Sequence, residues 1–174
     1  MQLSDHRDIA ATPEMVWSAL LNPKVLKACI PGCESMNGAP ETGYQAVVVQ
    51  RVGPVSARFT GIVQLTDITP GQAVTISGEG KGGAAGFAKG GAKVTLVAEG
   101  DGTRLNYEVE ASVGGKIAQL GSRIIDGFAK KLADQFFENF KSAVEQPAEA
   151  DSAEIVEAEE STNKKGWFRR VIGA

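Results

Sequence analysis

Two cysteines and one histidine are the residues of this chain that most often serve metal binding or redox chemistry. Three residues separate Cys29 from Cys33, whereas the redox-active C-x-x-C motif has two. His6 is the only histidine, so cysteine and histidine together cannot complete the ligand set of a zinc site. We therefore expect buried thiols, no metal site, no covalently bound cofactor and no catalytic residues. The protein is expected not to be an enzyme.

A glycine-rich segment at residues 78–91 invites a nucleotide-binding interpretation. Residues 78–83 satisfy the dinucleotide pattern G-x-G-x-x-G. However, the following residues are too rich in glycine to form the helix whose N-terminus would hold a pyrophosphate. Lys81 is followed by Gly82 rather than by Ser or Thr, so the P-loop pattern fails as well. We expect a glycine-rich hairpin, which is either a mobile loop or a gate over a pocket.

The last eleven residues combine basic and large apolar side chains. Wound as a helix, their apolar side chains would share an arc of about 140°. So short a helix is unstable in water and needs an apolar surface on which to fold. We favour a membrane surface over docking on the protein's own domain or on another protein. The residues expected to bind the membrane are Lys164, Lys165, Trp167, Phe168, Arg169, Arg170, Val171 and Ile172.

The distribution of charge divides the chain into three parts. Residues 147–163 hold six acidic and no basic side chains, and residues 164–174 hold four basic and no acidic ones. We therefore predict a folded domain at residues 1–146, a disordered acidic linker at residues 147–163 and a basic amphipathic tail at residues 164–174.

The overall composition excludes several classes of function. The chain has 174 residues, of which 43% are hydrophobic, and a net charge of −3, so a broad cationic surface for nucleic acid is not expected. It has neither a run of about 20 apolar residues that could span a bilayer nor a secretory signal. We expect a cytoplasmic protein that binds peripherally to the inner face of the cell membrane.

The hydrophobic periodicity predicts an α+β domain. Residues 12–13 and 22–23 carry N-cap and proline signals for two short helices after a first strand. Residues 44–113 alternate apolar and polar side chains between turn signals, which indicates a mostly antiparallel sheet. From residue 117 to 144, apolar residues recur with helical spacing and predict one long helix.

The inner face of the expected sheet is unusually rich in small residues. Either the long helix lies close and fills the space above them as ordinary core, or an apolar pocket remains between sheet and helix. Both interpretations stay open. The small residues are Ala57, Gly61, Gly78, Ala88, Gly90, Ala92 and Ala111.

Five features of the chain together resemble one known family. They are the N-terminal strand, the helix that follows Thr12, the Pro-Gly-Cys-Glu sequence at residues 31–34, the glycine-rich strands and the long helix. This is the CoxG family, named for a subunit of carbon monoxide dehydrogenase, within the SRPBCC superfamily that also contains START and Bet v 1-like proteins. The resemblance covers residues 1–146 and implies a helix-grip fold, in which a curved antiparallel sheet wraps around a long C-terminal helix and encloses an apolar cavity.

The resemblance also implies a function beside molybdenum-containing hydroxylases such as carbon monoxide dehydrogenase, which CoxG proteins are associated with attaching to the membrane. We expect the protein to bind a lipophilic quinone, of menaquinone or ubiquinone type, and to carry it between membrane and dehydrogenase, linking the enzyme to the respiratory chain. The alternative is a membrane recruitment or assembly factor without cargo. A cyclase-like or hydrolase-like enzyme ranks last, because inward-facing titratable pairs are lacking.

The cavity residues expected from this resemblance lie on the strands and the long helix. Phe87 is assigned to a possible gate, and Tyr107 and Gln50 are candidates for contact with the quinone headgroup. The full set is Val55, Phe59, Val63, Phe87, Tyr107, Ile117, Leu120, Ile124 and Phe128.

Overall fold

The protein is described from a computed structural model, which covers residues 1–145. Within them, seven strands, three α-helices and two short 3-10 turns follow the predicted order. Their bounds are β1 (Gln2–Ile9), α1 (Pro13–Leu20), α2 (Pro23–Cys29), β2 (Cys33–Ala39), β3 (Gly43–Val52), β4 (Val55–Thr69), β5 (Ala73–Lys81), η1 (Gly83–Ala85), β6 (Phe87–Glu99), β7 (Gly102–Gly114), η2 (Ala118–Leu120) and α3 (Ser122–Glu145).

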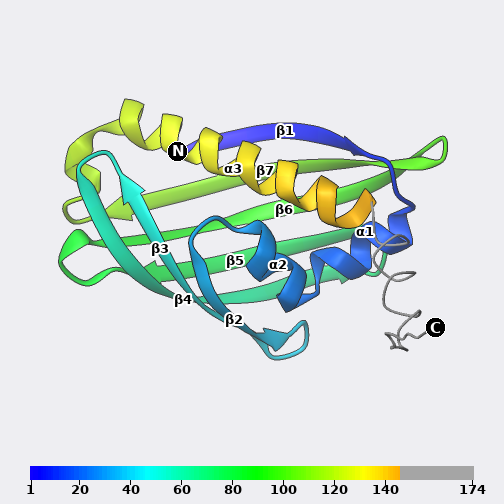
Figure 1. Cartoon of the computed structure of the whole chain (residues 1–174), viewed down its shortest axis with the longest axis horizontal. Helices are drawn as coiled ribbons and strands as arrows, with labels where there is room; N and C mark the ends of the chain where they lie inside the picture. Colours follow the sequence, from blue (N-terminus) through cyan, green and yellow to red (C-terminus); the bar gives the residue numbers. More distant parts are fainter. Residues whose placement is uncertain (146–174) are drawn as a thin grey trace, which may run out of the picture. The chain divides into compact units, whose positions relative to one another are not determined.

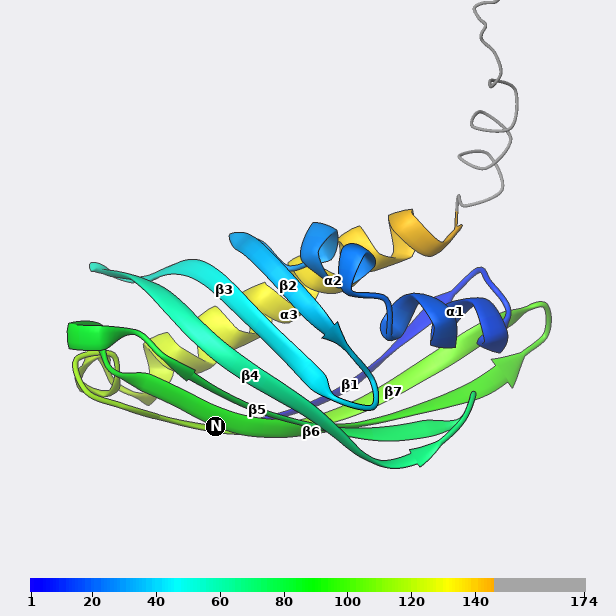
Figure 2. The same ribbon diagram turned by 90° about the horizontal axis from the view of Figure 1, so that it is seen from below.

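All seven strands form one antiparallel sheet in the order β1-β7-β6-β5-β4-β3-β2. Strands β2 to β7 follow one another as a meander, whereas β1 crosses to the far edge and pairs with β7. The sheet is curved, and all three helices lie on its concave side (Figures 1 and 2). The predicted helix-grip architecture, an α+β fold with an antiparallel sheet around a C-terminal helix, is therefore confirmed.

The two short helices begin at the caps that the sequence predicts. The Thr12 side chain accepts a hydrogen bond from the Met15 backbone N–H at 3.3 Å, and Asn22 accepts one from the Lys24 N–H at 2.9 Å. A proline follows each cap, where its missing N–H costs nothing. Side-chain hydrogen bonds then fix the helices: the Tyr44 hydroxyl donates to the Leu21 carbonyl at 2.7 Å.

The long helix begins five residues later than the sequence predicts. Residues 118–120 form a 3-10 turn, and Gly121 has a φ of +92°. Because a residue in that conformation cannot continue a right-handed helix, α3 starts at Ser122. The prediction that Ile117 and Leu120 belong to the helix is wrong; both lie in the turn that precedes it.

The glycine-rich segment is mostly regular sheet. Strands β5 and β6 pair without interruption from Ala73–Thr95 to Lys81–Phe87, and η1 makes the connection. The predicted glycine-rich hairpin is therefore confirmed, with its turn confined to the short connection around η1. Glycines fit here because a side chain at Gly90 would lie 2.3 Å from the Glu110 carbonyl oxygen of β7.

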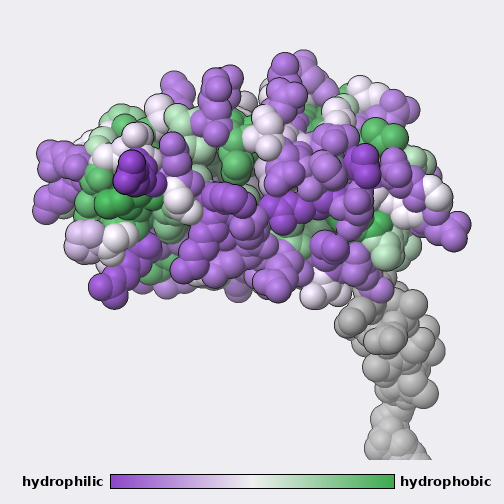
Figure 3. Space-filling view, turned by 90° about the horizontal axis from the view of Figure 1, so that it is seen from above, coloured by the Kyte–Doolittle hydropathy of each residue, from purple (hydrophilic) through white to green (hydrophobic). Residues whose placement is uncertain are grey.

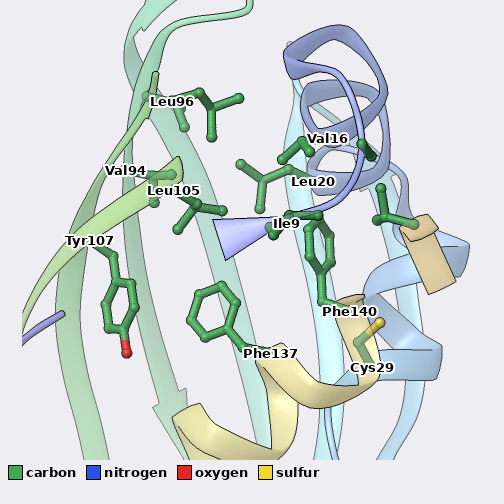
Figure 4. Close-up of a cluster of buried hydrophobic side chains, with 13 residues drawn as sticks. Ile9, Val16, Leu20, Cys29, Val94, Leu96, Leu105, Tyr107, Phe137 and Phe140 are labelled. Atoms are coloured by element: carbon green, nitrogen blue, oxygen red, sulfur yellow. The ribbon is translucent and has the colours of Figure 1, made fainter. Parts of the chain in front are cut away.

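The hydrophobic core fills only the half of the concave side that lies next to α1. Phe137 and Phe140 of α3 meet large side chains of β6 and β7 there (Figure 4), and the rings of Tyr107 and Phe137 stack with centroids 4.8 Å apart. Phe140 is 0% exposed and Leu105 is 0% exposed. Burying such side chains contributes about 1.5–3 kcal/mol each, so this half holds α3 on the sheet.

Candidate functional site

The other half of the concave face holds an apolar pocket of about 360 Å³. This volume falls in the range of about 300–1,000 Å³ that is common for small-molecule sites. The predicted small residues other than Ala57 are confirmed as part of its lining. The small residues that line it are Ala46, Gly61, Gly78, Gly80, Ala88, Gly90, Gly91, Ala92 and Ala111.

The pocket exists because the two halves of the sheet carry side chains of different size. Large side chains of α3 and of strands β6 and β7 fill the core near α1, whereas the pocket is lined mainly by small residues and by no residue of α3. The first half of α3 is accordingly less buried: Phe128 and Leu132 are half-buried and Ile124 is 45% exposed, whereas Phe140 is 0% exposed. Because the small residues contribute little side-chain volume and no α3 residue lines the pocket, the space above them stays open.

The wall of the pocket comes from β2, β3, β4 and the end of α2. Ile30 and Met36, which sequence reasoning missed, line it together with Val48. The segment after α2 is held in place because Gln50 Nε2 donates to the Pro31 carbonyl at 2.6 Å and the Val49 N–H donates to the Gly32 carbonyl at 2.9 Å. The apolar residues on either side of the Pro31-Gly32 turn could have indicated in the sequence that this segment contributes to the pocket wall.

The structure brings only two of the nine predicted cavity residues into the pocket lining, Phe59 and Val63. Tyr107 lies in the filled core, and Ile117 is buried in the turn before α3. Phe87 alternates along β6 with the pocket-lining Ala88, so its side chain lies on the outer side of the sheet, and it is 45% exposed.

The remaining predicted residues, Val55, Leu120, Ile124 and Phe128, lie outside the pocket lining. Leu120 and Ile124 approach the turn between β3 and β4 instead. A methyl group added at Gly53 would lie 3.9 Å from Leu120 Cδ1 and 4.0 Å from Ile124 Cγ2.

Both candidates for a headgroup contact already make a hydrogen bond within the protein. Gln50 is committed to the Pro31 carbonyl, and the Tyr107 hydroxyl accepts a hydrogen bond from Arg7 Nη2 at 3.0 Å. The inward-facing side chains around the pocket are apolar. The charged residues among its neighbours, Glu79, Lys89 and Glu110, are exposed and occupy the alternate, outward positions. The pocket therefore suits an apolar group and offers no acid or base to it.

Comparison with known proteins places the chain in a family. Residues 6–145 match the CoxG family, which is described as the G subunit of carbon monoxide dehydrogenase. The chain belongs to the CoxG family. No curated protein matches the chain closely enough to add a relative.

Among solved structures, this CoxG-family chain is similar to a conserved protein from Geobacillus kaustophilus, with 31% identity over 84% of this chain and 96% of that one, and a TM-score of 0.78. A putative uncharacterized protein from Rhizobium leguminosarum is 15% identical, covers 84% of this chain and 95% of its own, and has a TM-score of 0.65. Ara h 8.0201, at 15% identity, covers 83% of this chain and 97% of its own, with a TM-score of 0.57. The last two likenesses show the fold alone.

The charged cluster nearest the interior of the CoxG-family domain joins β1 to α3. Arg7 Nη2 donates to Asp134 Oδ1 at 2.6 Å, and its guanidinium carbon lies 5.2 Å from the centre of the Phe137 ring. Burial opposes the charge of Arg7, but the bonds to Asp134 and Tyr107 outweigh it and raise its pKa. The hydrogen bond from Arg7 lowers the pKa of Asp134. This pairing is structural, because its charges satisfy each other rather than face the pocket.

The cysteines are free thiols, as the sequence suggests. Cys29 is 1% exposed, and Cys33 is half-buried with its Sγ donating to the Ser35 carbonyl at 3.3 Å. Burial raises the pKa of both thiols. Within residues 1–145, no three His, Cys, Asp or Glu side chains are grouped as metal ligands would be.

A second, wider hollow of about 1090 Å³ lies over the outer face of the sheet. Charged side chains of both signs line it, among them Glu79, Lys89 and Glu110, and all three are exposed. Such a surface lacks the desolvated apolar walls of a ligand site, so the inner pocket is the better candidate.

The predicted linker and membrane tail, including Trp167 and Arg170, lie outside the described residues. In residues 1–145, no helix has the length and apolar character required to cross a bilayer.

Proposed function

We propose that this CoxG-family protein binds a lipophilic quinone by its isoprenoid chain in the inner pocket. It carries the quinone between the cytoplasmic membrane and a molybdenum-containing carbon monoxide dehydrogenase or related hydroxylase, and so links that enzyme to the respiratory chain. The observation that supports it best is the pocket itself, whose inward-facing side chains are all apolar.

The physical argument concerns the cost of leaving the bilayer. Each CH₂ group transferred from an apolar medium to water costs about 0.8 kcal/mol, so an isoprenoid chain leaves lipid only for an equally apolar site. Backbone groups on the pocket floor are already paired in the sheet, from β4 through β7. The floor therefore presents methyl and methylene surface without unsatisfied polar atoms.

The partner follows from the family. Its name refers to carbon monoxide dehydrogenase, an enzyme whose electrons need an acceptor. A binding role rather than a catalytic one agrees with the absence of ionisable side chains facing the pocket in the described residues. In our proposal the basic amphipathic tail at residues 164–174 keeps the protein on the inner face of the membrane.

The test is mass spectrometry of organic extracts of the purified full chain. A Gly78→Leu variant fills the pocket, because a Cβ at Gly78 would make ordinary contacts of 3.6 Å with Val63 Cγ2 and the Ile62 oxygen. Thr95→Leu adds an equivalent side chain at an exposed position of β6 outside the pocket. We expect quinone at nearly one-to-one ratio in the wild type and in Thr95→Leu, and its loss in Gly78→Leu.

Two outcomes would contradict the proposal. Quinone retained by Gly78→Leu at the wild-type ratio would place it elsewhere. Absence of quinone from every sample, with no binding of added quinone, would favour a recruitment factor without cargo. A chain ending at Gln146 distinguishes a further case: quinone that is present only with the tail is adhering membrane lipid.

A further inference from the structure

Three turns meet at one end of the domain and form a continuous surface, which we call the loop end. It consists of residues 51–55 between β3 and β4, residues 81–87 around η1, and residues 114–125 from β7 into α3, all at the left of Figure 1. The Ile117 N–H donates to the Ala85 carbonyl at 3.0 Å, which joins the second turn to the third. The first turn lies beside the third, since a Cβ added at Gly53 would lie 3.9 Å from Leu120 Cδ1 and 4.0 Å from Ile124 Cγ2.

The loop end is positively charged. Its three segments hold four basic residues, Arg51, Lys81, Lys116 and Arg123, and no acidic one. All four are exposed, and no ion pair joins any of them to another residue within 1–145. The nearest carboxylates along the chain are Asp126, just beyond the third segment, and Glu79, two residues before the second.

The opposite end of the domain has the reverse charge. Its three connections, residues 10–14, 66–72 and 99–102, hold four acidic residues and no basic one. They lie at the right of Figure 1. The acidic residues are Glu14, Asp67, Glu99 and Asp101. Such a separation of charge gives the domain a preferred orientation in the field of a negatively charged surface.

Apolar side chains are exposed among the basic ones. Phe87 and Ile124 are each 45% exposed. The space-filling view shows a hydrophobic area beside strongly hydrophilic side chains at the end where α3 begins (Figure 3). Basic residues around exposed apolar groups are the combination that binds an anionic membrane interface.

The loop end adjoins the pocket. Phe59, which lines the pocket, packs its ring under Gly82, where an added Cβ would lie only 2.6 Å from that ring. Gly80 and Ala88 line the pocket, and their chain neighbours Lys81 and Phe87 belong to the loop end. A surface that covers the loop end is therefore next to the pocket wall.

We propose that the loop end docks on the surface of an anionic lipid bilayer, as a contact site separate from the C-terminal tail. Arg51, Lys116 and Arg123 contact lipid phosphates, and Phe87 and Ile124 enter the interface. The proposal deepens the carrier function, because docking would bring the pocket wall to the lipid from which a quinone comes. It rests on that proposed function only for the identity of the cargo.

The test uses the full chain in a Cys33→Ser background, with an environment-sensitive nitrobenzoxadiazole label on Ser122→Cys at the loop end or on Thr69→Cys at the opposite end. Both positions are exposed. Vesicles contain phosphatidylcholine and phosphatidylglycerol in equal parts, or phosphatidylcholine alone, without quinone. We expect the emission of the label at position 122 to shift to the blue with anionic vesicles only, while the label at position 69 stays in water.

Charge-reversed variants provide the matched control. Arg51→Glu, Lys116→Glu and Arg123→Glu together should lower the vesicle affinity reported by the label at position 122 by at least about tenfold. The control variant combines Lys24→Glu, Lys27→Glu and Lys93→Glu, which change the net charge by the same amount at exposed positions elsewhere. Its vesicle affinity should stay within about twofold of that of the parent protein. Circular dichroism confirms that both variants fold.

Several results would overturn the docking proposal. If the label at position 122 stays in water while the chain sediments with anionic vesicles, the tail alone holds the protein on the membrane. Equal losses in the two charge-reversed variants would indicate a general charge effect. A shift at position 122 only after addition of the dehydrogenase would make the loop end a protein interface. Because no quinone is present, these results are independent of whether the pocket binds it.

Discussion

Arg7 and Asp134, 127 positions apart in the sequence, form a hydrogen-bonded ion pair of 2.6 Å that fastens edge strand β1 to the middle of α3. Phe137, which lies one helical turn after Asp134, belongs to the buried core. The ion pair and the packing of Phe137 therefore hold the middle of α3 on the same side of the sheet.

The first prediction concerns pH. The bond from Arg7 lowers the pKa of Asp134 below its ordinary 3.8, so the contribution of the pair is complete above that value and is lost as the pH falls through the lowered pKa. The free energy of unfolding of the wild type should exceed that of Asp134→Asn at neutral pH, and the difference should shrink below about pH 4. Urea unfolding measured across this range checks it.

The control for the pH prediction is built into the comparison. Asp8, whose pKa is also lowered by the hydrogen bond from Arg104, is present in both proteins, so its contribution cancels. A difference between wild type and Asp134→Asn that does not change with pH would show that the substitution acts through packing.

The second prediction compares two phenylalanines of α3. Phe140 is 0% exposed and packs in the core, whereas Phe128, nearer the start of α3, is only half-buried. Phe140→Ala should lower the free energy of unfolding by about 3–5 kcal/mol, and Phe128→Ala by about 1 kcal/mol. Denaturant titrations give both values. Equal losses would mean that the first half of α3 is as firmly packed as the second.

The third prediction separates two glycines of the pocket floor. A Cβ at Gly90 would lie 2.3 Å from the Glu110 carbonyl oxygen, and one at Gly80 would lie 3.8 Å from Phe59 Cβ. Gly90→Ala should therefore destabilise the protein by about 1–3 kcal/mol through overpacking. Gly80→Ala should be neutral or stabilise by up to about 1 kcal/mol, because alanine loses less backbone entropy. Thermal unfolding of the two variants provides the measurement.

The fourth prediction concerns the thiols. Burial raises the pKa of both Cys29 and Cys33, so little thiolate forms near neutral pH. With Ellman's reagent at pH 7, the native protein should react slowly at half-buried Cys33 and not at Cys29, and both should react at once in denaturant. Rapid reaction of native Cys29 would indicate that the contact between α2 and α3, where Asn139 donates to the Cys29 carbonyl at 3.0 Å, opens readily.

Sequence reasoning determined the elements and the character of the inner face. Alternation along β4 and β5 identified which residues point inward, because successive side chains of a strand take opposite faces. Small residues at those positions were enough to raise the possibility of a pocket. Capping residues such as Thr12 located the short helices, since local hydrogen bonds decide where a helix begins.

Tertiary structure decided where the pocket lies and which residues line it. The positive φ of Gly121 delayed the start of α3, and large side chains, among them Phe137 and Phe140, fill the core near α1 but do not line the pocket. Ile30 and Met36 reach the pocket only because β2 and the end of α2 fold over the sheet.

The difference between what the sequence predicts and what only the tertiary structure decides has a physical reason. Side-chain alternation and helix caps are local properties, readable from a few neighbouring residues. The empty volume above Gly78 and the gathering of Arg51, Lys81 and Arg123 at one end depend on contacts between residues far apart in the chain. Only the folded arrangement of β3, β5 and α3 could reveal them.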